Sequence, residues 1–269
     1  QLNILWDHFY GVCEDEIYPT HEIDGGPGPD EALQRAAQLL AGAERPVMLA
    51  GGGVSQGDAV EQTVALAEYL TMPVANSYLH NDSFPAGHGL SVGPIGYCGS
   101  KAAMRALADA DVVLALGSRL GPFGTLPQYD LDYWPARARL IQVDLDPRVL
   151  GQSRRVDVPV QADARAFAAA LLTRLRAVAP GRQPDTARLG QLEQDKQRWQ
   201  QELRGWHEGA ATERMHPRAL LWELGRALPG DAIVATDIGN NASMANAYLR
   251  FSGPRRHLAA LSWGNCGFA

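Results

Sequence analysis

Short apolar runs alternate with helix-like segments from Pro29 to about Arg176, and this alternation limits the fold more than any other feature of the sequence. The runs have the composition of strands that are buried on both faces of a parallel sheet. Because predicted helices precede the first run, separate the first three runs and follow the last one, we expect helices to cover the sheet. The predicted strands are Val47–Ala50, Val74–Asn76, Val112–Leu116, Leu140–Asp144 and Val158–Gln161, and the predicted helices are Asp30–Leu40, Asp58–Leu70, Lys101–Ala108 and Ala164–Ala177. The fold class is therefore α/β, with a Rossmann-like domain built on a parallel sheet.

Two of the predicted strands end in glycine-containing turns, Gly51-Gly52-Gly53 and Gly117-Ser118-Arg119. The first turn has the composition of a phosphate cradle for a dinucleotide. However, its spacing does not give the G-x-G-x-x-G fingerprint, and no acidic residue stands at the next strand end to bind a ribose. We therefore favour a tight strand-to-helix turn without a ligand.

The segment between Asn76 and Gly99 has little periodicity and many turn-forming residues. A structureless loop of this length is uncommon in a compact domain unless it has a function. His80 and His88 lie in it, but a loop histidine is more often a surface or packing residue than a ligand. We therefore predict that the loop has a function, but we assign no role in that function to either histidine.

A proline-bearing polar stretch, residues 180–186, precedes an amphipathic segment. The apolar side chains of that segment fall on one helical face, which predicts a helix docked between domains; they are Leu189, Leu192, Trp199, Leu203 and Trp206. A second helix is expected to open at His216-Pro217-Arg218 and to run to about Leu228, since proline is tolerated in the first helical turn.

A further strand and turn follow that helix. Ile233 and Val234 are predicted to form a buried parallel strand, and residues 237–241 the turn at its carboxyl end, where α/β sheets bind ligands. Gly239 accepts backbone angles that other residues avoid, and Asn240 or Asn241 is expected to cap a helix over 242–249. Exposed amides at such a turn favour an anion.

Another turn, Trp263-Gly264-Asn265-Cys266-Gly267-Phe268, comes after the apolar run 258–261. So few elements cannot bury both faces of a sheet, so we expect this last domain to be incomplete within the 269 residues.

The composition excludes some classes of function. The formal net charge is −6 and no basic stripe is visible, which argues against a nucleic-acid partner. The cysteines Cys13, Cys98 and Cys266 have neither metal-ligand spacing nor a disulfide framework, which suits a reducing compartment. Without a signal peptide or a membrane-length apolar run, a cytoplasmic location is expected.

Several stretches together resemble the thiamine-diphosphate enzymes related to acetolactate synthase, and within them the sulfoacetaldehyde acetyltransferases. They extend over nearly the whole chain: SYLHND (77–82), GYCGSKAAM (96–104), DVVLALGSRLGPFGTLPQ (111–128), DYWP (132–135), MHPR (215–218), TDIGN (236–240) and SWGNCGFA (262–269). This resemblance implies that residues 1–12 end an N-terminal pyrimidine-binding domain, 13–28 form a linker, 29–178 a central domain, 179–212 a linker with an amphipathic helix, and 213–269 the start of a diphosphate-binding domain.

The resemblance also implies a reaction. With thiamine diphosphate and Mg²⁺, sulfoacetaldehyde and phosphate would give acetyl phosphate and sulfite, in a homo-oligomer (dimer or tetramer). The loop 76–99 lacks the Gly-Lys-Gly pattern of flavin-binding relatives, so no FAD is expected. The activating glutamate belongs to the N-terminal domain of such enzymes and the metal-binding residues follow the last turn, so no catalytic or metal-binding residue is expected in this chain, which alone should be inactive.

The resemblance implies that two turns of this chain lie at the cofactor. In the family the turn that matches Asp237, Gly239, Asn240 and Asn241 lies near the diphosphate. The turn that matches Gly264, Asn265 and Cys266 lies beside the aminopyrimidine, so the Gly264 carbonyl would accept from the 4′-amino group and the Cys266 side chain would support the bent cofactor.

Other functions remain open from the sequence. The nearest is another thiamine-diphosphate enzyme, such as an acetolactate synthase. A second is a nucleotide-binding module that uses Gly51-Gly52-Gly53, and a third is a module for assembly alone.

Overall fold

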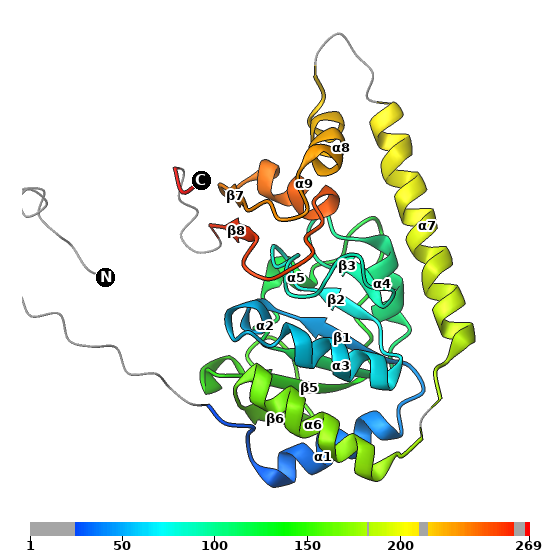
Figure 1. Cartoon of the computed structure of the whole chain (residues 1–269), viewed down its shortest axis with the longest axis vertical. Helices are drawn as coiled ribbons and strands as arrows, with labels where there is room; N and C mark the ends of the chain where they lie inside the picture. The colour runs from blue at the N-terminus through cyan, green and yellow to red at the C-terminus, as the bar shows by residue number, and fades with distance from the viewer. Residues whose placement is uncertain (1–24, 182, 210–214, 261–266) are drawn as a thin grey trace, which may run out of the picture.

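A six-stranded, fully parallel sheet forms the centre of the structure, a computed structural model that describes residues 25–181, 183–209, 215–260 and 267–269. The strand order is β3-β2-β1-β4-β5-β6, so the direction of winding reverses between β1 and β4 (Figure 1). The strands are β1 (Pro46–Ala50), β2 (Val74–Asn76), β3 (Ser91–Pro94), β4 (Val112–Leu116), β5 (Arg139–Asp144) and β6 (Val158–Gln161). The predicted α/β class with a parallel sheet is confirmed.

Helices cover both faces of this sheet because successive strand residues point to opposite sides. Met48, Leu114 and Ile141 pack on one face with α1 (Asp30–Ala41), α3 (Val60–Leu70) and α6 (Ala164–Val178). Val47 and Val113 pack on the other face with α4 (Lys101–Ala108). The middle strands β1 and β4 are buried along their whole length, which explains why they are continuous apolar runs.

Several short elements of this domain were not predicted. The glycine turn after β1 continues directly into a short helix, α2 (Gly52–Gln56), and α3 begins at Val60 and not at Asp58. The loop 76–99 contains the edge strand β3, whose Gly93 and Pro94 are unfavourable in a central strand but are tolerated at an edge. The remaining short elements are α5 (Pro122–Thr125) and the 3₁₀ turn Pro147–Val149.

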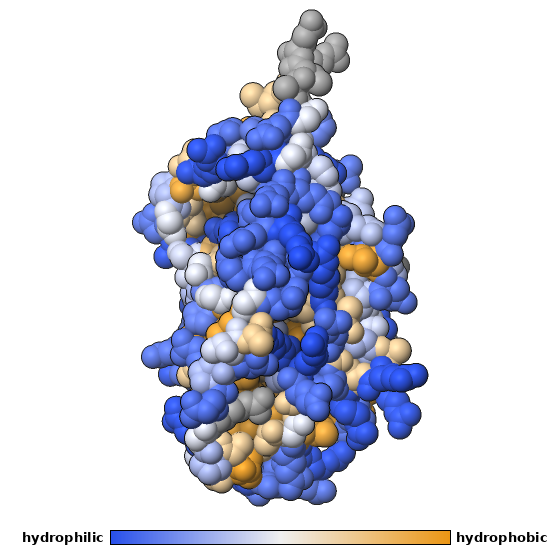
Figure 2. Space-filling view, turned by 90° about the vertical axis from the view of Figure 1, so that its right-hand side faces the viewer, coloured by the Kyte–Doolittle hydropathy of each residue, from blue (hydrophilic) through white to orange (hydrophobic). Residues whose placement is uncertain are grey.

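Helix α7 (Thr186–Glu208) runs along the side of the sheet domain and confirms the predicted amphipathic helix (Figure 1). Leu192, Trp199 and Leu203 are buried, and its outward surface is the hydrophilic band in the middle of Figure 2. Asp195 is also buried, and it accepts a hydrogen bond from Arg105 of α4 at 3.3 Å. This contact fastens α7 to the sheet domain.

A smaller unit follows α7 and consists of α8 (Pro217–Ala227), β7 (Val234–Thr236), α9 (Asn240–Tyr248) and β8 (His257–Ala259). β7 and β8 pair in parallel as a two-stranded sheet. The prediction that Ile233 belongs to a buried strand is wrong: Ile233 precedes β7 and is 67% exposed, because neither face of so small a sheet is fully covered near it. None of the helices in the described part of the chain is both long and apolar enough to cross a membrane.

Candidate functional site

Asp237 lies directly after β7 and binds the backbone of residues 267–269. Its carboxylate accepts hydrogen bonds from the backbone N–H groups of Gly267 at 2.9 Å, Phe268 at 2.7 Å and Ala269 at 3.1 Å. These bonds, that of Gly267 first, lower the pKa of Asp237 below its ordinary value. The Asp237 carboxylate therefore holds residues 267–269 against the turn that follows β7.

Gly239, Asn240 and Asn241 form the start of α9. Gly239 has a φ of +120°, which favours glycine, and it is the N-cap residue. The predicted cap by Asn240 or Asn241 is wrong, because the helix begins at Asn240 and no side chain caps it. Both asparagines are exposed, and they begin the first turn of α9 directly after the Asp237 turn.

Such an amino terminus suits a diphosphate, since unpaired N–H groups and the helix dipole both favour negative charge. Gly264, Asn265 and Cys266, which we expect at the aminopyrimidine, lie outside the described residues. Among the described residues, no group of three or more His, Cys, Asp or Glu side chains could hold a metal ion.

The loop 76–99 packs against α9, and this explains its length. The Leu79 N–H donates to Asn246 Oδ1 at 3.1 Å, and Asn246 Nδ2 donates to the Tyr97 carbonyl at 3.3 Å. Asn246 is fully buried. The partners are about 150 to 170 residues apart in sequence, so the loop joins the sheet domain to the smaller unit.

A second contact of the loop reaches the first turn of α9. The hydroxyls of Tyr78 and Ser243 are 2.8 Å apart, and Ser243 Oγ donates to the Gly239 carbonyl at 3.1 Å. The Tyr78 ring in turn stacks on Phe123, with ring centroids 6.3 Å apart. Nothing in the sequence indicated a contact between Tyr78 and Ser243, although Tyr78 and Phe123 lie in the stretches SYLHND (77–82) and 111–128 of the family resemblance. The loop therefore fixes the position of the turn that precedes α9.

The glycine turns at the carboxyl edge of the sheet pack against each other. The Gly53 N–H donates to the Gly117 carbonyl at 3.0 Å, and a Cβ at Gly52 would lie 2.6 Å from Cε1 of His80. Burial lowers the pKa of His80, and the Arg119 charge lowers it further against the opposing effect of Asp82. The Gly53 amide is thus already paired and Gly52 is covered, which leaves little room for a phosphate at this turn.

The two loop histidines have different roles. His80 covers Gly52 as a packing residue, whereas His88 Nε2 lies 3.2 Å from the exposed carboxylate of Glu68. Both are consistent with the prediction that the function of this loop does not depend on a histidine ligand.

His257 is a buried histidine of the smaller unit that faces the loop. Its ring stacks on Phe251, with centroids 4.9 Å apart, and neither ring nitrogen has a hydrogen-bond partner among the described residues. Burial lowers the pKa of His257 to about 4; the carboxylate of Asp82 opposes this and His80 reinforces it. Asp82 Oδ2 meanwhile accepts from the backbone N–H of Arg256 at 3.0 Å.

The buried His257 predicts acid sensitivity. An unfolded histidine has a pKa of about 6.5, so between pH 6.5 and pH 4 the unfolded chain binds a proton that the folded chain excludes. We expect the free energy of unfolding to fall by about 3 kcal/mol over this interval, as urea titrations would measure. His257→Asn should remove most of this fall, with a remainder from His80. An equal fall in both proteins would contradict the assignment.

Comparison with known proteins identifies the family of the chain and several of its relatives. A model for the central domain of thiamine pyrophosphate enzymes matches residues 33–171. The sulfoacetaldehyde acetyltransferase of Castellaniella defragrans is 52% identical over 284 positions, which cover 100% of this chain and 48% of that protein. The sulfoacetaldehyde acetyltransferase of Alcaligenes xylosoxydans xylosoxydans is 49% identical with the same coverage. A probable acetolactate synthase large subunit of Methanocaldococcus jannaschii is 29% identical, over 88% of this chain and 39% of that protein.

These matches confirm the resemblance that the sequence motifs predicted. The similarity to the two acetyltransferases extends along the entire chain, and the acetolactate synthase is more distant. The chain spans about half the length of the acetyltransferases it matches, 48% in each case.

Proposed function

Since the chain belongs to the thiamine pyrophosphate enzymes, whose central domain its residues 33–171 match, we propose that it serves an acyltransferase that converts sulfoacetaldehyde and phosphate to acetyl phosphate and sulfite. The observation that carries this proposal is the 52% identity to a sulfoacetaldehyde acetyltransferase over the whole chain. The activating glutamate and the Mg²⁺ ligands would come from outside these 269 residues, so the chain alone would be inactive.

When bound, thiamine diphosphate supplies a thiazolium ring that stabilises negative charge on the carbon of a carbonyl substrate. The first-turn N–H groups of α9, beginning at Asn240, would hold the diphosphate. Asn241 and Gly239 would shape the same turn, because a Cβ at Gly239 would lie 3.4 Å from Asn241 Oδ1. Gly264, Asn265 and Cys266 would contact the aminopyrimidine, as expected from the sequence.

Asp237 would act through position and not by contact with the cofactor. Its three hydrogen bonds draw residues 267–269 toward the end of β7, next to the start of α9. Residues 267–269 are thereby held beside the turn that follows β7, where a cofactor would contact both segments.

Asn240→Pro tests the diphosphate site with little damage to the helix. Proline is tolerated at the first helical position, and the preceding Gly239 already has an extended ψ of −162°. The change removes one N–H donor, so thiamine diphosphate with Mg²⁺ should bind about tenfold more weakly by calorimetry, the effect of one charge-assisted hydrogen bond. Asn240→Ala keeps the N–H and is the matched control; equal affinity of the two variants would refute the amide contact.

The reaction itself is tested by product analysis of the enzyme that contains this chain. Acetyl phosphate and sulfite from sulfoacetaldehyde and phosphate would support the proposal. Acetolactate formed from pyruvate without any sulfonate would instead assign the chain to the acetolactate synthases.

The remaining features follow from the same proposal. The chain would divide as expected from the sequence, with a central domain over 29–178 and a diphosphate-binding domain from 213, and the enzyme would be a cytoplasmic homo-oligomer. It would not bind FAD, which is consistent with the paired amide of Gly53 and the His80 ring over Gly52. Titration with FAD should give no binding heat, and measurable binding would overturn this part of the proposal.

A further inference from the structure

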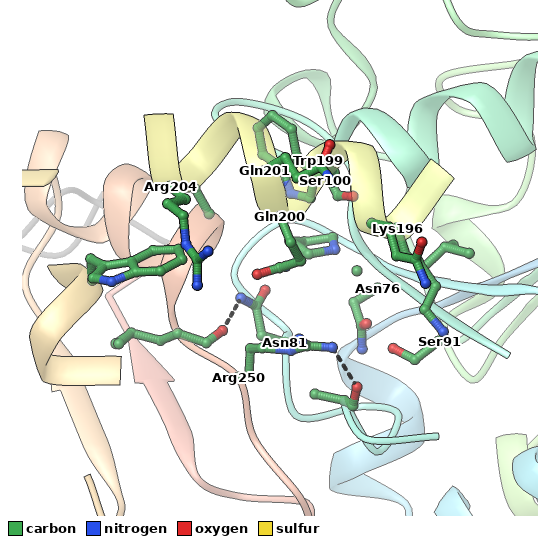
Figure 3. A pocket seen from close by; sticks show the side chains of 18 of the residues that line it. Asn76, Asn81, Ser91, Ser100, Lys196, Trp199, Gln200, Gln201, Arg204 and Arg250 are labelled. Atoms are coloured by element: carbon green, nitrogen blue, oxygen red, sulfur yellow. Dashed lines mark hydrogen bonds between the residues drawn. The ribbon is translucent and has the colours of Figure 1, made fainter. Parts of the chain in front are cut away.

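A cavity of about 550 Å³ lies where three parts of the chain meet (Figure 3). Its walls are the edge strand β3, the α7 residues 193–204, and residues 247–250 after the core of α9. This volume is within the range of sites that bind small molecules. We call it the α7 groove; neither Asp237 nor the first turn of α9 lines it.

The α7 groove is predominantly cationic. Lys196, Arg204 and Arg250 line it, and Glu193 is the one carboxylate among its lining residues. Glu193 already pairs with Lys196 at 2.9 Å. Among the described residues, Arg204 has neither a hydrogen-bond nor an ion-pair partner, and Figure 3 shows it at the opposite end of the groove from Lys196. Arg250 already donates to the Ala86 carbonyl at 2.9 Å and Lys196 to the Gly89 carbonyl at 3.1 Å, but each keeps further N–H donors. Two guanidinium groups and an ammonium group in one cavity therefore favour an anion such as phosphate.

A buried amide oxygen in the groove lacks a donor. Asn81 Nδ2 donates to the carbonyls of Asn246 at 2.9 Å and Leu249 at 3.2 Å, which fixes the orientation of the amide. Asn81 Oδ1 has no partner among the described residues, although the side chain is 96% buried (relative exposure 4%). In Figure 3 Asn81 lies between Arg250 and Gln200, inside the groove. A buried carbonyl of this kind favours a ligand that brings an N–H or O–H group.

We propose that the α7 groove binds a small phosphate monoester that carries an amino or hydroxyl group. The phosphate would pair with the cationic side chains, Arg204 in particular, and the amino or hydroxyl group would donate to Asn81 Oδ1. The net charge of the lining side chains, three cations against one carboxylate, matches the charge of a phosphate monoester near neutral pH. Because the groove joins β3, α7 and residue 250, a bound ligand would hold the smaller unit against the sheet domain. The inference does not depend on the reaction proposed above.

Calorimetric titration with two probes tests both halves of the site. The probes are 2-aminoethyl phosphate and ethyl phosphate; the first has an additional ammonium group, which supplies the N–H donor together with one positive charge. We expect one binding site for 2-aminoethyl phosphate, and about tenfold weaker binding of ethyl phosphate. Absence of binding of 2-aminoethyl phosphate would overturn the proposal, and equal affinity for both probes would overturn the role of Asn81.

A matched pair of variants on α7 locates the site. Arg204→Gln removes a lining charge and should weaken binding of 2-aminoethyl phosphate about tenfold. Arg198→Gln makes the same change on the same helix outside the groove and should leave binding unchanged. Both arginines are exposed, and thermal melts of the two variants would verify that they fold. Equal effects of the two substitutions would show that the probe binds elsewhere, which would also overturn the proposal.

Discussion

Gly51→Ala is expected to lower the free energy of unfolding by about 4 kcal/mol, near the upper end for single substitutions. A Cβ at Gly51 would overlap the carbonyl oxygen of Gly117 and would lie 2.7 Å from its carbonyl carbon. Both atoms belong to the backbone of Gly117, directly after β4, and Gly51 directly follows the adjacent strand β1. Both strands are fully buried, so no side chain can rotate to make room. Thermal unfolding should show a melting temperature about 8–16 °C lower.

Gly190→Ala is the control for this prediction. Gly190 is exposed in the second turn of α7, and a Cβ there would have no neighbour within 4 Å. Because alanine has a higher helix propensity than glycine, this variant should be about 0.5–1 kcal/mol more stable than the parent chain. If Gly51→Ala melted within a degree or two of the parent, the close contact between the two strand ends would be wrong.

The strands β1 and β4 could be predicted from the sequence for a physical reason. β1 and β4 are buried on both faces, so their composition alone identifies them as parallel strands. The edge strand β3 has no such signal, because its Gly93 and Pro94 are also typical of turns. α2 was missed for a related reason: a glycine run predicts a turn, whereas here the Gly53 N–H bonds to the Gly117 carbonyl and the His80 ring packs on Gly52, at the start of a helix.

The candidate site was only partly predictable. The turn at Asp237 and the helix after it follow from the apolar run and Gly239, so their place at a strand end could be inferred. The acceptor role of Asp237 could not, because its partners, the N–H groups of residues 267–269, lie 30 to 32 residues further along the chain. The α7 groove was likewise out of reach, since its lining residues come from segments that are brought together only in the folded chain.

The contacts of the loop 76–99 also could not be predicted, because they join segments that are distant in the sequence. Its length indicated a function, but its partners on α9 are about 150 to 170 residues away in the sequence. Apolar periodicity carries no information about such polar pairing between distant segments. The sequence therefore did not indicate the structural role of Asn246, a fully buried residue of α9 that binds the loop.

Asn246→Ala is expected to cost about 3 kcal/mol and to loosen α9 from the loop. Asn246 is fully buried, and the substitution leaves the buried Leu79 N–H without an acceptor and the Tyr97 carbonyl without its donor. Unsatisfied buried groups of this kind lose the full free energy of their hydration. The exchange of the Leu79 amide hydrogen with solvent should become faster in the variant, together with that of the α9 amides.

The location of the faster exchange distinguishes two descriptions of this contact. If the loop fastens an otherwise separate unit, the amides of β4 should keep their protection in Asn246→Ala while those of α9 lose it. Asn240→Ala, on the exposed first turn of the same helix, should change the stability by no more than about 0.5 kcal/mol. Unchanged exchange at Leu79 would contradict the hydrogen bond to Asn246. Equal loss of protection at β4 and α9 would show instead that the sheet domain and the smaller unit unfold together. In that case the loop belongs to one continuous core, and the α7 groove would be a cavity inside that core and not a junction between two units.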